Sequence, residues 1–233
     1  LEGLERAVAD AAGVVPDAVE IEEDGLRFRV APRTGQKTGW FYDQRDNRAR
    51  LDRYVQGRRV LDVFSYTGAW GIRAAARGAR DVLCVDSSAA ALDQVAVNAA
   101  LNGVGDRVHT RQGDAFVVLK ALREARERFD VVIVDPPAFI KRRKDFKEGA
   151  LAYRRLNEMA MQVLDRDGIL VSCSCSQLLA RETLAQTLLQ GARHLDRNLV
   201  ILEQGQQGPD HPVHPAIPET DYLKVILARV LPG

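Results

Sequence analysis

Residues 60–68 read Val-Leu-Asp-Val-Phe-Ser-Tyr-Thr-Gly, an apolar run with one acid that leads into a turn of small residues. A turn of this kind suits close approach of the backbone to a ligand, because Gly68 carries no side chain. Neither the Gly-x-Gly-x-x-Gly pattern of dinucleotide sites nor the Gly-Lys-Ser/Thr of a P-loop is present in the sequence. The stretch therefore favours a nucleotide ligand without phosphates.

The same arrangement repeats along the rest of the chain, where short apolar runs alternate with amphipathic segments. Strands that alternate with helices predict βαβ units with right-handed crossovers and helices on both faces of the sheet. We therefore expect an α/β fold with a doubly wound, seven-stranded, mostly parallel, Rossmann-like sheet. The predicted strands are 60–64, 82–86, 107–113, 129–135, 168–175, 200–203 and 222–230, and the predicted helices are 69–77, 88–101, 115–127, 151–164 and 180–193.

The first 56 residues have a different pattern, and we interpret them as an extension ahead of a catalytic domain over residues 57–233. The dipeptide Asp24-Gly25 lies between two loosely alternating runs, which is typical of a hairpin turn. The predicted elements of the extension are a helix over 1–17, a hairpin over 19–30 and an Arg-rich helix over 46–55.

Composition excludes several classes of protein. The 33 Lys and Arg residues nearly balance the 32 Asp and Glu residues, so a uniformly basic nucleic-acid surface is excluded while a local basic patch is not. No apolar run of about 18 residues predicts a membrane span. The three cysteines form no disulfide framework, which indicates a reducing compartment, and we expect the cytoplasm. The spacing of Cys173 and Cys175 predicts no metal site. Because the chain begins at Leu1 without Met or a signal peptide, we expect a part of a longer product.

Three further acids each close a consecutive predicted strand, at the edge where ligands bind in such sheets. Asp86 lies roughly 20 residues beyond the first turn, where a carboxylate can accept hydrogen bonds from both ribose hydroxyls. Asp114 has two interpretations, since it would either bind an adenine amino group or cap the next helix. Asp135 precedes Pro136 and Pro137, which stiffen the turn and hold Asp135 in extended geometry. We expect the three carboxylates to face one site.

The last candidate is a thiol at the end of the strand predicted over residues 168–175. Alternation along a strand puts Cys173 and Cys175 on the same face, with Cys175 nearer the end. Buried cysteines usually act as small hydrophobic side chains, which is our interpretation of Cys84 and Cys173. For Cys175, that interpretation and a role as nucleophile both remain open from its position alone.

These residues resemble the class I S-adenosylmethionine-dependent methyltransferases. They are more similar still to the bacterial RlmI-type enzymes, which methylate carbon 5 of a cytosine in large-subunit ribosomal RNA. The likeness runs from about Gly25 to the C-terminus. Proteins of this type carry a small RNA-binding PUA domain ahead of the catalytic region, and we find no such domain in this sequence. Beside Asp62, Asp86 and Asp114, the resemblance rests on the blocks 35–40, 42–46, 64–68, 135–139, 174–176, 210–213 and 222–224.

The resemblance implies S-adenosylmethionine as cofactor, a homodimer, and a role for each residue of the site. Asp86 and Ser87 would hold the ribose, and Asp114 and Ala115 would lie at the adenine. Gln44 and Arg45 would reach the cofactor carboxylate or the substrate, since a guanidinium can bind a carboxylate through two hydrogen bonds. Otherwise Arg45 is a solvated charge. The remaining cofactor-binding residues would be Asp62, Phe64, Ser65, Tyr66, Thr67, Gly68 and Asp135.

The resemblance also implies a covalent mechanism. Carbon 5 of cytosine becomes a useful nucleophile once a thiolate adds to carbon 6, and Cys175 would supply that thiolate while Asp135 hydrogen-bonds the ring. The base must leave its stack, with Tyr66, Phe139 and Trp40 either stacking on it or packing in the core. Basic side chains next to this turn would bind phosphates, or form a plain solvated loop. The expected RNA contacts are Pro136, Pro137, Phe139, Lys141 and Arg142.

Three other functions are open. A related guanine methyltransferase would share the turn and the Asp-Pro-Pro segment but needs no cysteine nucleophile. A non-catalytic RNA-binding module could keep the fold, although intact Asp86, Asp135 and Cys175 argue against it. The missing glycine pattern disfavours a dehydrogenase. Many RNA cytosine-C5 enzymes carry a second cysteine where this chain has Ala138, and RlmI-type proteins also lack it.

Overall fold

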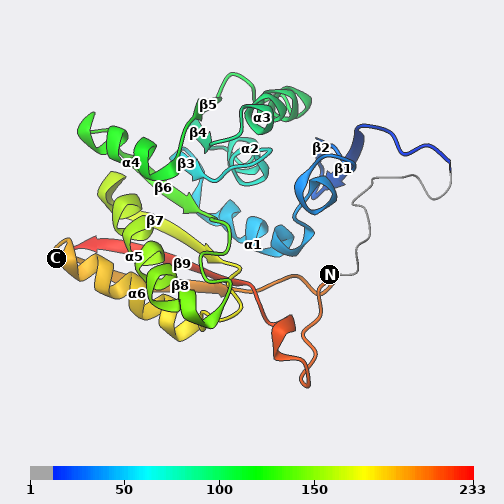
Figure 1. The fold of residues 1–233 in the computed structure, drawn as a ribbon. Helices are drawn as coiled ribbons and strands as arrows, with labels where there is room; N and C mark the ends of the chain where they lie inside the picture. Colours follow the sequence, from blue (N-terminus) through cyan, green and yellow to red (C-terminus); the bar gives the residue numbers. More distant parts are fainter. Residues whose placement is uncertain (1–12) are drawn as a thin grey trace.

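Seven strands form one sheet in the order β5-β4-β3-β6-β7-β9-β8 in a computed structural model that describes residues 13–233 (Figure 1). Strand β9 runs antiparallel to both of its neighbours, while the other neighbouring strands run parallel. The doubly wound, mostly parallel α/β fold predicted from the sequence is confirmed. The strands are β3 (Arg59–Val63), β4 (Asp81–Asp86), β5 (Val108–Gln112), β6 (Phe129–Val134), β7 (Leu164–Ser174), β8 (Arg197–Gly205) and β9 (Lys224–Pro232).

Helices cover both faces of this sheet and create two hydrophobic cores. The alternation of side chains along β6 shows the division, because Val131 and Ile133 enter one core while Val132 and Val134 enter the other. Residues of α2 and α3 pack in the first core, and residues of α4, α5 and α6 pack in the second (Figure 1). The helices are α2 (Ala69–Ala76), α3 (Ala89–Leu101), α4 (Ala115–Glu124), α5 (Phe146–Val163) and α6 (Arg181–His194).

The strand order reverses between β3 and β6, which lie side by side although β4 and β5 separate them in the sequence. The carboxyl ends of the two strands are joined, since the backbone N–H of Asp135 donates to the carbonyl of Val63 at 3.3 Å. In open α/β sheets a ligand binds at such a reversal. The fold thus brings the ends of β3 and β6 to the position where a site is expected.

The N-terminal extension packs on the same core as α2 and α3. Its hairpin consists of β1 (Val19–Glu23) and β2 (Leu26–Val30), and it turns at Asp24 and Gly25 with φ angles of 52° and 79°. Positive φ at both central residues is typical of a tight hairpin turn, so this prediction is confirmed. The residues of the extension that enter the core are Leu26, Phe28, Val30, Trp40, Leu51 and Val55.

A buried ion pair ties the hairpin to the short helix α1 (Arg45–Arg50). Arg48 is 1% exposed and donates to Glu23 through both Nε, at 2.7 Å, and Nη2. Trp40 is 2% exposed and donates its indole N–H to the same carboxylate at 3.0 Å. The hypothesis that Trp40 stacks on a substrate base is therefore wrong, because its ring is enclosed between Phe28 and Arg48.

Several element boundaries differ from those predicted. Residues 1–12 of the expected first helix lie outside the described residues, and residues 13–17 form no helix, since Gly13 has a φ of 68°. The Arg-rich segment is helical over Arg45–Arg50 and continues as a 3-10 turn over Leu51–Tyr54. Helix α5 begins at Phe146, five positions before the predicted start at 151.

No helix within residues 13–233 has the length and apolar character that a membrane span requires. The division into an extension over 1–56 and a domain over 57–233 stays a prediction.

Candidate active site

The turn after β3 has a backbone conformation that few side chains adopt. Phe64 and Tyr66 have φ angles of 66° and 48°, and Gly68 follows with 86°. A left-handed conformation costs a non-glycine residue about 1–3 kcal/mol, so other contacts must hold it. The N–H of Tyr66 donates to Asp86 at 2.9 Å, and the N–H of Gly68 donates to the Ser65 carbonyl at 2.8 Å. The turn is thereby fixed to the end of β4.

Asp62 lies beneath this turn and is completely buried. Its Oδ2 accepts a hydrogen bond at 2.9 Å from the N–H of Gly71 in the first turn of α2. Burial raises the pKa of Asp62 to about 7. The hydrogen bond from Gly71 lowers this pKa, and the charges of Asp135 and Asp86 raise it. Asp86 and Asp135 thus lie close enough to Asp62, at the same edge of the sheet, for their charges to raise its pKa.

Asp86 uses both carboxyl oxygens to organise the backbone around it. One oxygen accepts from Tyr66 and the other accepts from the N–H of Ser88, each at 2.9 Å. Ser88 caps α3 with its side chain, and the neighbouring Ser87 is exposed. Each carboxylate oxygen has a second lone pair, so Asp86 keeps acceptor capacity for a ligand hydroxyl.

Asp114 has the capping geometry that the sequence allowed as one of its two interpretations. Its Oδ1 accepts from the N–H groups of Phe116 and Val117 at 3.0 and 3.1 Å, and these begin helix α4. Asp114 is exposed, while Ala115 beside it is buried. Capping leaves Oδ2 of Asp114 available, so the two interpretations are compatible.

Asp135 is held by two side-chain donors. Trp70 donates its indole N–H to Oδ2 at 3.1 Å, and Gln44 donates its amide N–H to the same oxygen at 3.0 Å. Gln44 is fixed in turn by the amide of Asn47 at 2.8 Å. Burial raises the pKa of Asp135 to about 6, although the Trp70 hydrogen bond opposes this, and the charge of Asp43 raises it further. A carboxyl group poised near neutral pH can act in either protonation state.

Cys175 directly follows β7 and is half-buried. Its thiol lies 3.9 Å from the carbonyl oxygen of Pro136 and donates to it, which places the sulfur against the Asp-Pro-Pro segment. Burial raises the pKa of Cys175, and the charges of Asp135 and Asp43 raise it further, while Lys224 lowers it. Cys173 and Cys84 are fully buried, as their interpretation as core residues predicts.

Three residues beside Cys175 were missed by the sequence reasoning, although they lie within blocks of the family resemblance. Asp43 is 8% exposed and accepts from the hydroxyl of Tyr222 at 2.8 Å, which joins the extension to the segment before β9. Lys224 is 4% exposed and donates to the carbonyls of Ser176 and Tyr222 at 2.7 and 2.9 Å. Asp43 is about 180 residues away from Tyr222 and Lys224 in the sequence and carries no spacing signal with them, so only the fold could bring the three together.

The predicted site residues Arg45, Phe139 and Tyr66 contact neighbouring side chains of the protein. Arg45 pairs with its neighbour Asp46 at 3.3 Å, which agrees with the interpretation as a solvated charge. Phe139 packs on Tyr153 with ring centroids 4.8 Å apart, and Tyr66 meets Phe41 edge to face. Pro136 and Pro137 follow Asp135, and Pro137 is exposed.

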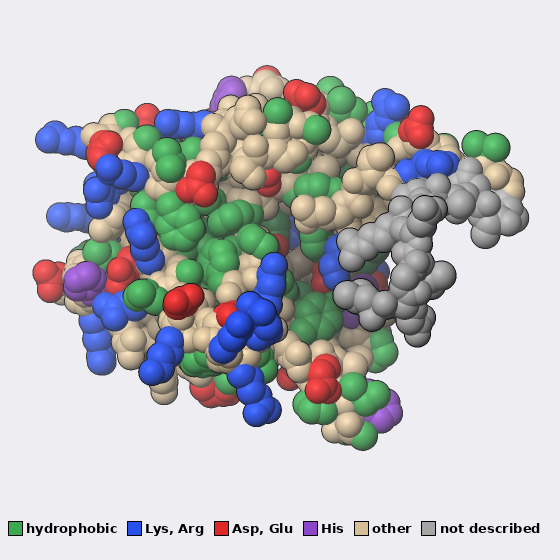
Figure 2. Space-filling model, in the orientation of Figure 1, with side chains coloured by type: hydrophobic (Ala, Val, Ile, Leu, Met, Phe, Trp, Pro, Cys, Tyr) green, Lys and Arg blue, Asp and Glu red, His purple; other side chains and the backbone are tan. Residues whose placement is uncertain are grey.

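The predicted basic run is a surface feature. Residues 141–144 are exposed, and Arg142 pairs with Asp145 at 3.0 Å. Figure 2 shows Lys and Arg side chains gathered on the face where Figure 1 draws the entry into α5. Lys141 and Arg142 therefore border the Asp-Pro-Pro turn in sequence and project outward from it.

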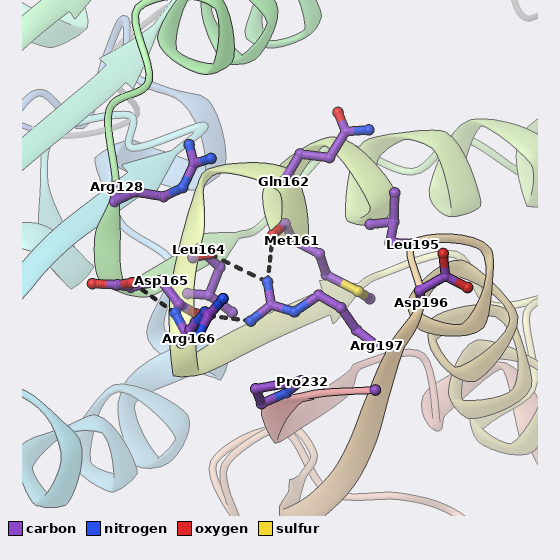
Figure 3. Close-up of a pocket in the computed structure, with 11 residues that line it drawn as sticks. Arg128, Met161, Gln162, Leu164, Asp165, Arg166, Leu195, Asp196, Arg197 and Pro232 are labelled. Carbon is purple, nitrogen blue, oxygen red and sulfur yellow. Dashed lines mark hydrogen bonds between the residues drawn. The ribbon is translucent and has the colours of Figure 1, made fainter.

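A cavity lies at the opposite edge of the sheet. It has a volume of about 560 Å³ and is lined by the start of β7, the end of β9 and residues 195–197 (Figure 3). Arg197 reaches across it and donates to the carbonyls of Met161, Leu164 and Asp165. These hydrogen bonds join α5, β7 and β8 and give Arg197 a structural task. Within residues 13–233 no three His, Cys, Asp or Glu side chains are grouped to hold a metal ion.

Similarity to known proteins identifies the family of the chain. The sequence profile of the S-adenosylmethionine-dependent methyltransferases matches residues 6–229. The chain belongs to this family. Its fold is also that of SMU.776 complexed with SAH, with a TM-score of 0.83 at 24% identity over 93% of this chain and 57% of that one. TYW2 of M. jannaschii in complex with AdoMet has a TM-score of 0.67 at 15% identity, over 94% of this chain and 88% of that one.

Curated relatives of the methyltransferase are longer proteins. It is 38% identical over 232 residues to "Ribosomal RNA large subunit methyltransferase I" of Erwinia tasmaniensis, covering 99% of this chain and 59% of that protein. It is 39% identical over 231 residues to the protein of the same name from Aeromonas salmonicida, covering 98% of this chain and 58% of that protein. The chain thus spans less than two thirds of the length of these relatives. The resemblance to RlmI-type proteins stated from the sequence is confirmed.

The residues at the carboxyl edge fit S-adenosylmethionine, the methyl donor of the family. This molecule carries a sulfonium and an ammonium, so its site needs oxygen atoms that accept hydrogen bonds or carry negative charge. Buried oxygens that accept no hydrogen bond from residues 13–233 include Oδ1 of Asp43, Oδ1 of Asp62, Oγ of Ser65 and Oγ1 of Thr67. An unpaired buried acceptor costs about 1–3 kcal/mol, and a cationic ligand would remove that cost. A cation would also favour the ionised forms of Asp62 and Asp135.

Proposed function

We propose that this methyltransferase transfers a methyl group to carbon 5 of a cytosine in large-subunit ribosomal RNA, through a covalent adduct of Cys175. The observation that carries the proposal is the contact of the Cys175 thiol with the Pro136 carbonyl, next to Asp135 and at the cofactor edge of the sheet. The names of the curated relatives support the choice of RNA. Cys175 is only half-buried, which supports access of a cytosine ring to its thiol.

In this mechanism, S-adenosylmethionine supplies the methyl group as an electrophile. The Cys175 thiolate adds to carbon 6 of the ring, which forms a C–S bond and moves an electron pair toward carbon 5. Asp135 hydrogen-bonds the ring, either as a protonated carboxyl that donates to N3 and stabilises the added electron density, or as a carboxylate that accepts from the amino group and orients the base. After methylation of carbon 5, a base removes its proton, the ring double bond returns and Cys175 leaves as thiolate. Asp135 or water serves as that base.

We assign the remaining residues by their places at the edge. The turn over residues 64–68, with Asp62 beneath it, would hold the methionine part, Asp86 and Ser87 the ribose, and Asp114 and Ala115 the adenine. Gln44 would orient Asp135, to which it is hydrogen-bonded. Pro136, Pro137 and Phe139 would border the flipped base, and exposed Lys141 and Arg142 would bind phosphates. Three free thiols fit a reducing compartment, and we place the activity in the cytoplasm.

The test is to incubate the chain with protein-free large-subunit rRNA and methyl-labelled S-adenosylmethionine and to identify the labelled nucleoside. We expect 5-methylcytidine with the wild type, at least about 100-fold less with Cys175→Ala, and near wild-type labelling with Cys173→Ala as matched control. Label in a guanine derivative, or 5-methylcytidine that persists in Cys175→Ala, would contradict the proposal.

Methylation of a guanine is the second candidate. The observation that favours it is that burial and two carboxylates raise the pKa of Cys175, which opposes thiolate formation. A guanine enzyme would leave this thiol unused. The same labelling experiment separates the two candidates, because guanine methylation survives the loss of Cys175.

A further inference from the structure

Ser176, the residue after Cys175, joins four separate elements. It is completely buried, and its hydroxyl accepts from the N–H of Ile140 at 3.1 Å and bonds the hydroxyl of Tyr153 at 2.8 Å. Its carbonyl accepts from Lys224 at 2.7 Å. These contacts connect the segment after Asp-Pro-Pro, helix α5 and strand β9 to the end of β7. The backbone that carries Cys175 is therefore held from several sides.

Lys224 is the charged member of this arrangement. It begins β9, pairs with Ser174 of β7 in the antiparallel register, and reaches past that strand end to the Ser176 carbonyl. Its second hydrogen bond goes to the carbonyl of Tyr222 at 2.9 Å. The described residues provide no carboxylate partner for it in a salt bridge, although a buried ammonium is costly without one. Burial lowers the pKa of Lys224, the charges of Asp221 and Cys175 raise it, and Arg181 lowers it, while both hydrogen bonds of its ammonium go to carbonyl oxygens.

The charges that face Cys175 come from several elements. Asp135 after β6 and Asp43 of the extension raise its pKa, and Lys224 lowers it. Tyr153 of α5 and Tyr222 before β9 also interact with the thiol, and each keeps its proton because burial raises its pKa. Among the charged side chains of residues 13–233 that most affect the pKa of Cys175, Lys224 is thus the cation. It lowers this pKa, whereas the carboxylates of Asp135 and Asp43 raise it.

We propose that Lys224 is a positioning residue for Cys175, which fixes the backbone beside the thiol and supplies the positive charge that favours its thiolate. This inference rests on the proposed function, in which Cys175 is the nucleophile. Lys224 need not touch the substrate, since it acts through the residue next to Cys175. Burial lowers the pKa of Lys224 to about 8, so most of its charge is present at neutral pH and is lost as pH rises through 8.

The test measures the rate at which iodoacetamide alkylates Cys175, as a function of pH. Buried Cys84 and Cys173 are subtracted with a Cys175→Ser blank. Lys224→Gln keeps a hydrogen-bond donor and removes the charge, and we expect its alkylation at pH 7.5 to fall roughly three- to tenfold. Tyr153→Phe is the matched control, because it removes a hydrogen bond to the same Ser176 without changing any charge. Its pH profile should match the wild type.

Lys224→Arg provides a second measurement that does not depend on how well Lys224→Gln folds. An Arg side chain stays charged at all accessible pH, whereas Lys224 loses its charge near pH 8. The alkylation rate of wild-type Cys175 should therefore rise with pH over a broader range than a single titrating group gives. In Lys224→Arg, the rate should follow the titration of a single group. Thermal melting and S-adenosylmethionine binding establish that each variant is folded.

The failures of this inference and of the proposed function are distinguishable. Profiles of Lys224→Gln and wild type that coincide, or a Tyr153→Phe shift equal to that of Lys224→Gln, overturn the role of Lys224 whatever base is methylated. A shifted thiol profile together with methylation that survives in Cys175→Ala overturns the nucleophile and keeps the electrostatic coupling.

Discussion

Asp62 and Asp135 occupy the ends of neighbouring strands in surroundings that oppose their ionisation. Burial raises the pKa of Asp62 to about 7 and that of Asp135 to about 6, each from an ordinary value of 3.8. Each carboxyl group therefore loses its proton between pH 5 and 8 instead of near pH 4. In our proposal this edge binds S-adenosylmethionine, which carries positive charge, so ionisation of the two groups and binding of the cofactor favour each other.

We predict that the affinity for S-adenosylmethionine rises with pH. As pH increases from about 5.5 to 7.5, both carboxyl groups become anionic and attract the sulfonium and ammonium, so Kd should fall roughly five- to tenfold. SAH, which lacks the sulfonium charge, should show a weaker dependence. Isothermal titration with both ligands across this range is the measurement. Parallel curves for the two ligands would show that the sulfonium is not near these carboxylates.

At the scale of single residues, the sequence was informative where function follows from position in a strand. Asp86 ends β4, and Asp114 and Asp135 follow β5 and β6 within two residues. The place of Cys175 nearer the end of its predicted strand separated it from the buried Cys173. It was uninformative where partners come from distant segments. Lys224 and Asp43 influence the pKa of Cys175 only because β9 inserts beside β7 and the extension folds back, and neither arrangement leaves a local pattern in the sequence.

Close packing of α2 on β4 depends on a single glycine. A side chain at Gly71 would place its Cβ 2.5 Å from the sulfur of Cys84 and 3.2 Å from Oδ2 of Asp62. The helix therefore lies near enough for the Gly71 N–H to reach Asp62. Gly71 therefore sets how closely α2 approaches the end of β3.

Gly71→Ala should lower the free energy of unfolding by roughly 1–3 kcal/mol, because the clash with Cys84 forces the helix away. Adding Cys84→Ala removes the obstructing sulfur, so the double variant should be less destabilised than the sum of the two single variants. Gly105→Ala is the control, since nothing lies within 4 Å of a Cβ at that position. Urea unfolding followed by circular dichroism gives these values, and strict additivity would contradict the argument.

At the scale of elements, every predicted strand of the sheet and all five predicted helices of the sheet region are present. Helix α5 shows why boundaries were harder. The predicted helix began at residue 151, yet Gly149 is already a helical residue. A Cβ there would meet Ile140 at 2.4 Å and the carbonyl oxygen of Phe139 at 2.8 Å. The glycine permits the Asp-Pro-Pro segment to pack on the helix, a tertiary reason that a local pattern does not contain.

For the whole molecule, the extension and the sheet share one hydrophobic core and several polar contacts. Arg29 N–H donates to Asn98 of α3 at 2.7 Å, and Asp43 accepts from Tyr222 at 2.8 Å. We therefore predict that both parts unfold in one transition, with equal calorimetric and van't Hoff enthalpies. Glu23→Gln, which weakens the buried pair with Arg48, should lower the melting temperature without splitting the peak. Two resolved transitions would instead favour independent domains that meet near residue 56.

The antiparallel strand β9 has a consequence for synthesis. It lies between β7 and β8 in the sheet and yet follows both in the sequence. While the ribosome is still adding residues 224–232, both of those strands present unpaired edges that can pair with other chains. Lys224, the first residue of β9, arrives in the same step. The nascent protein thus acquires its protected sheet and the surroundings of its thiol together, and a chain interrupted before β9 would be both inactive and prone to aggregate.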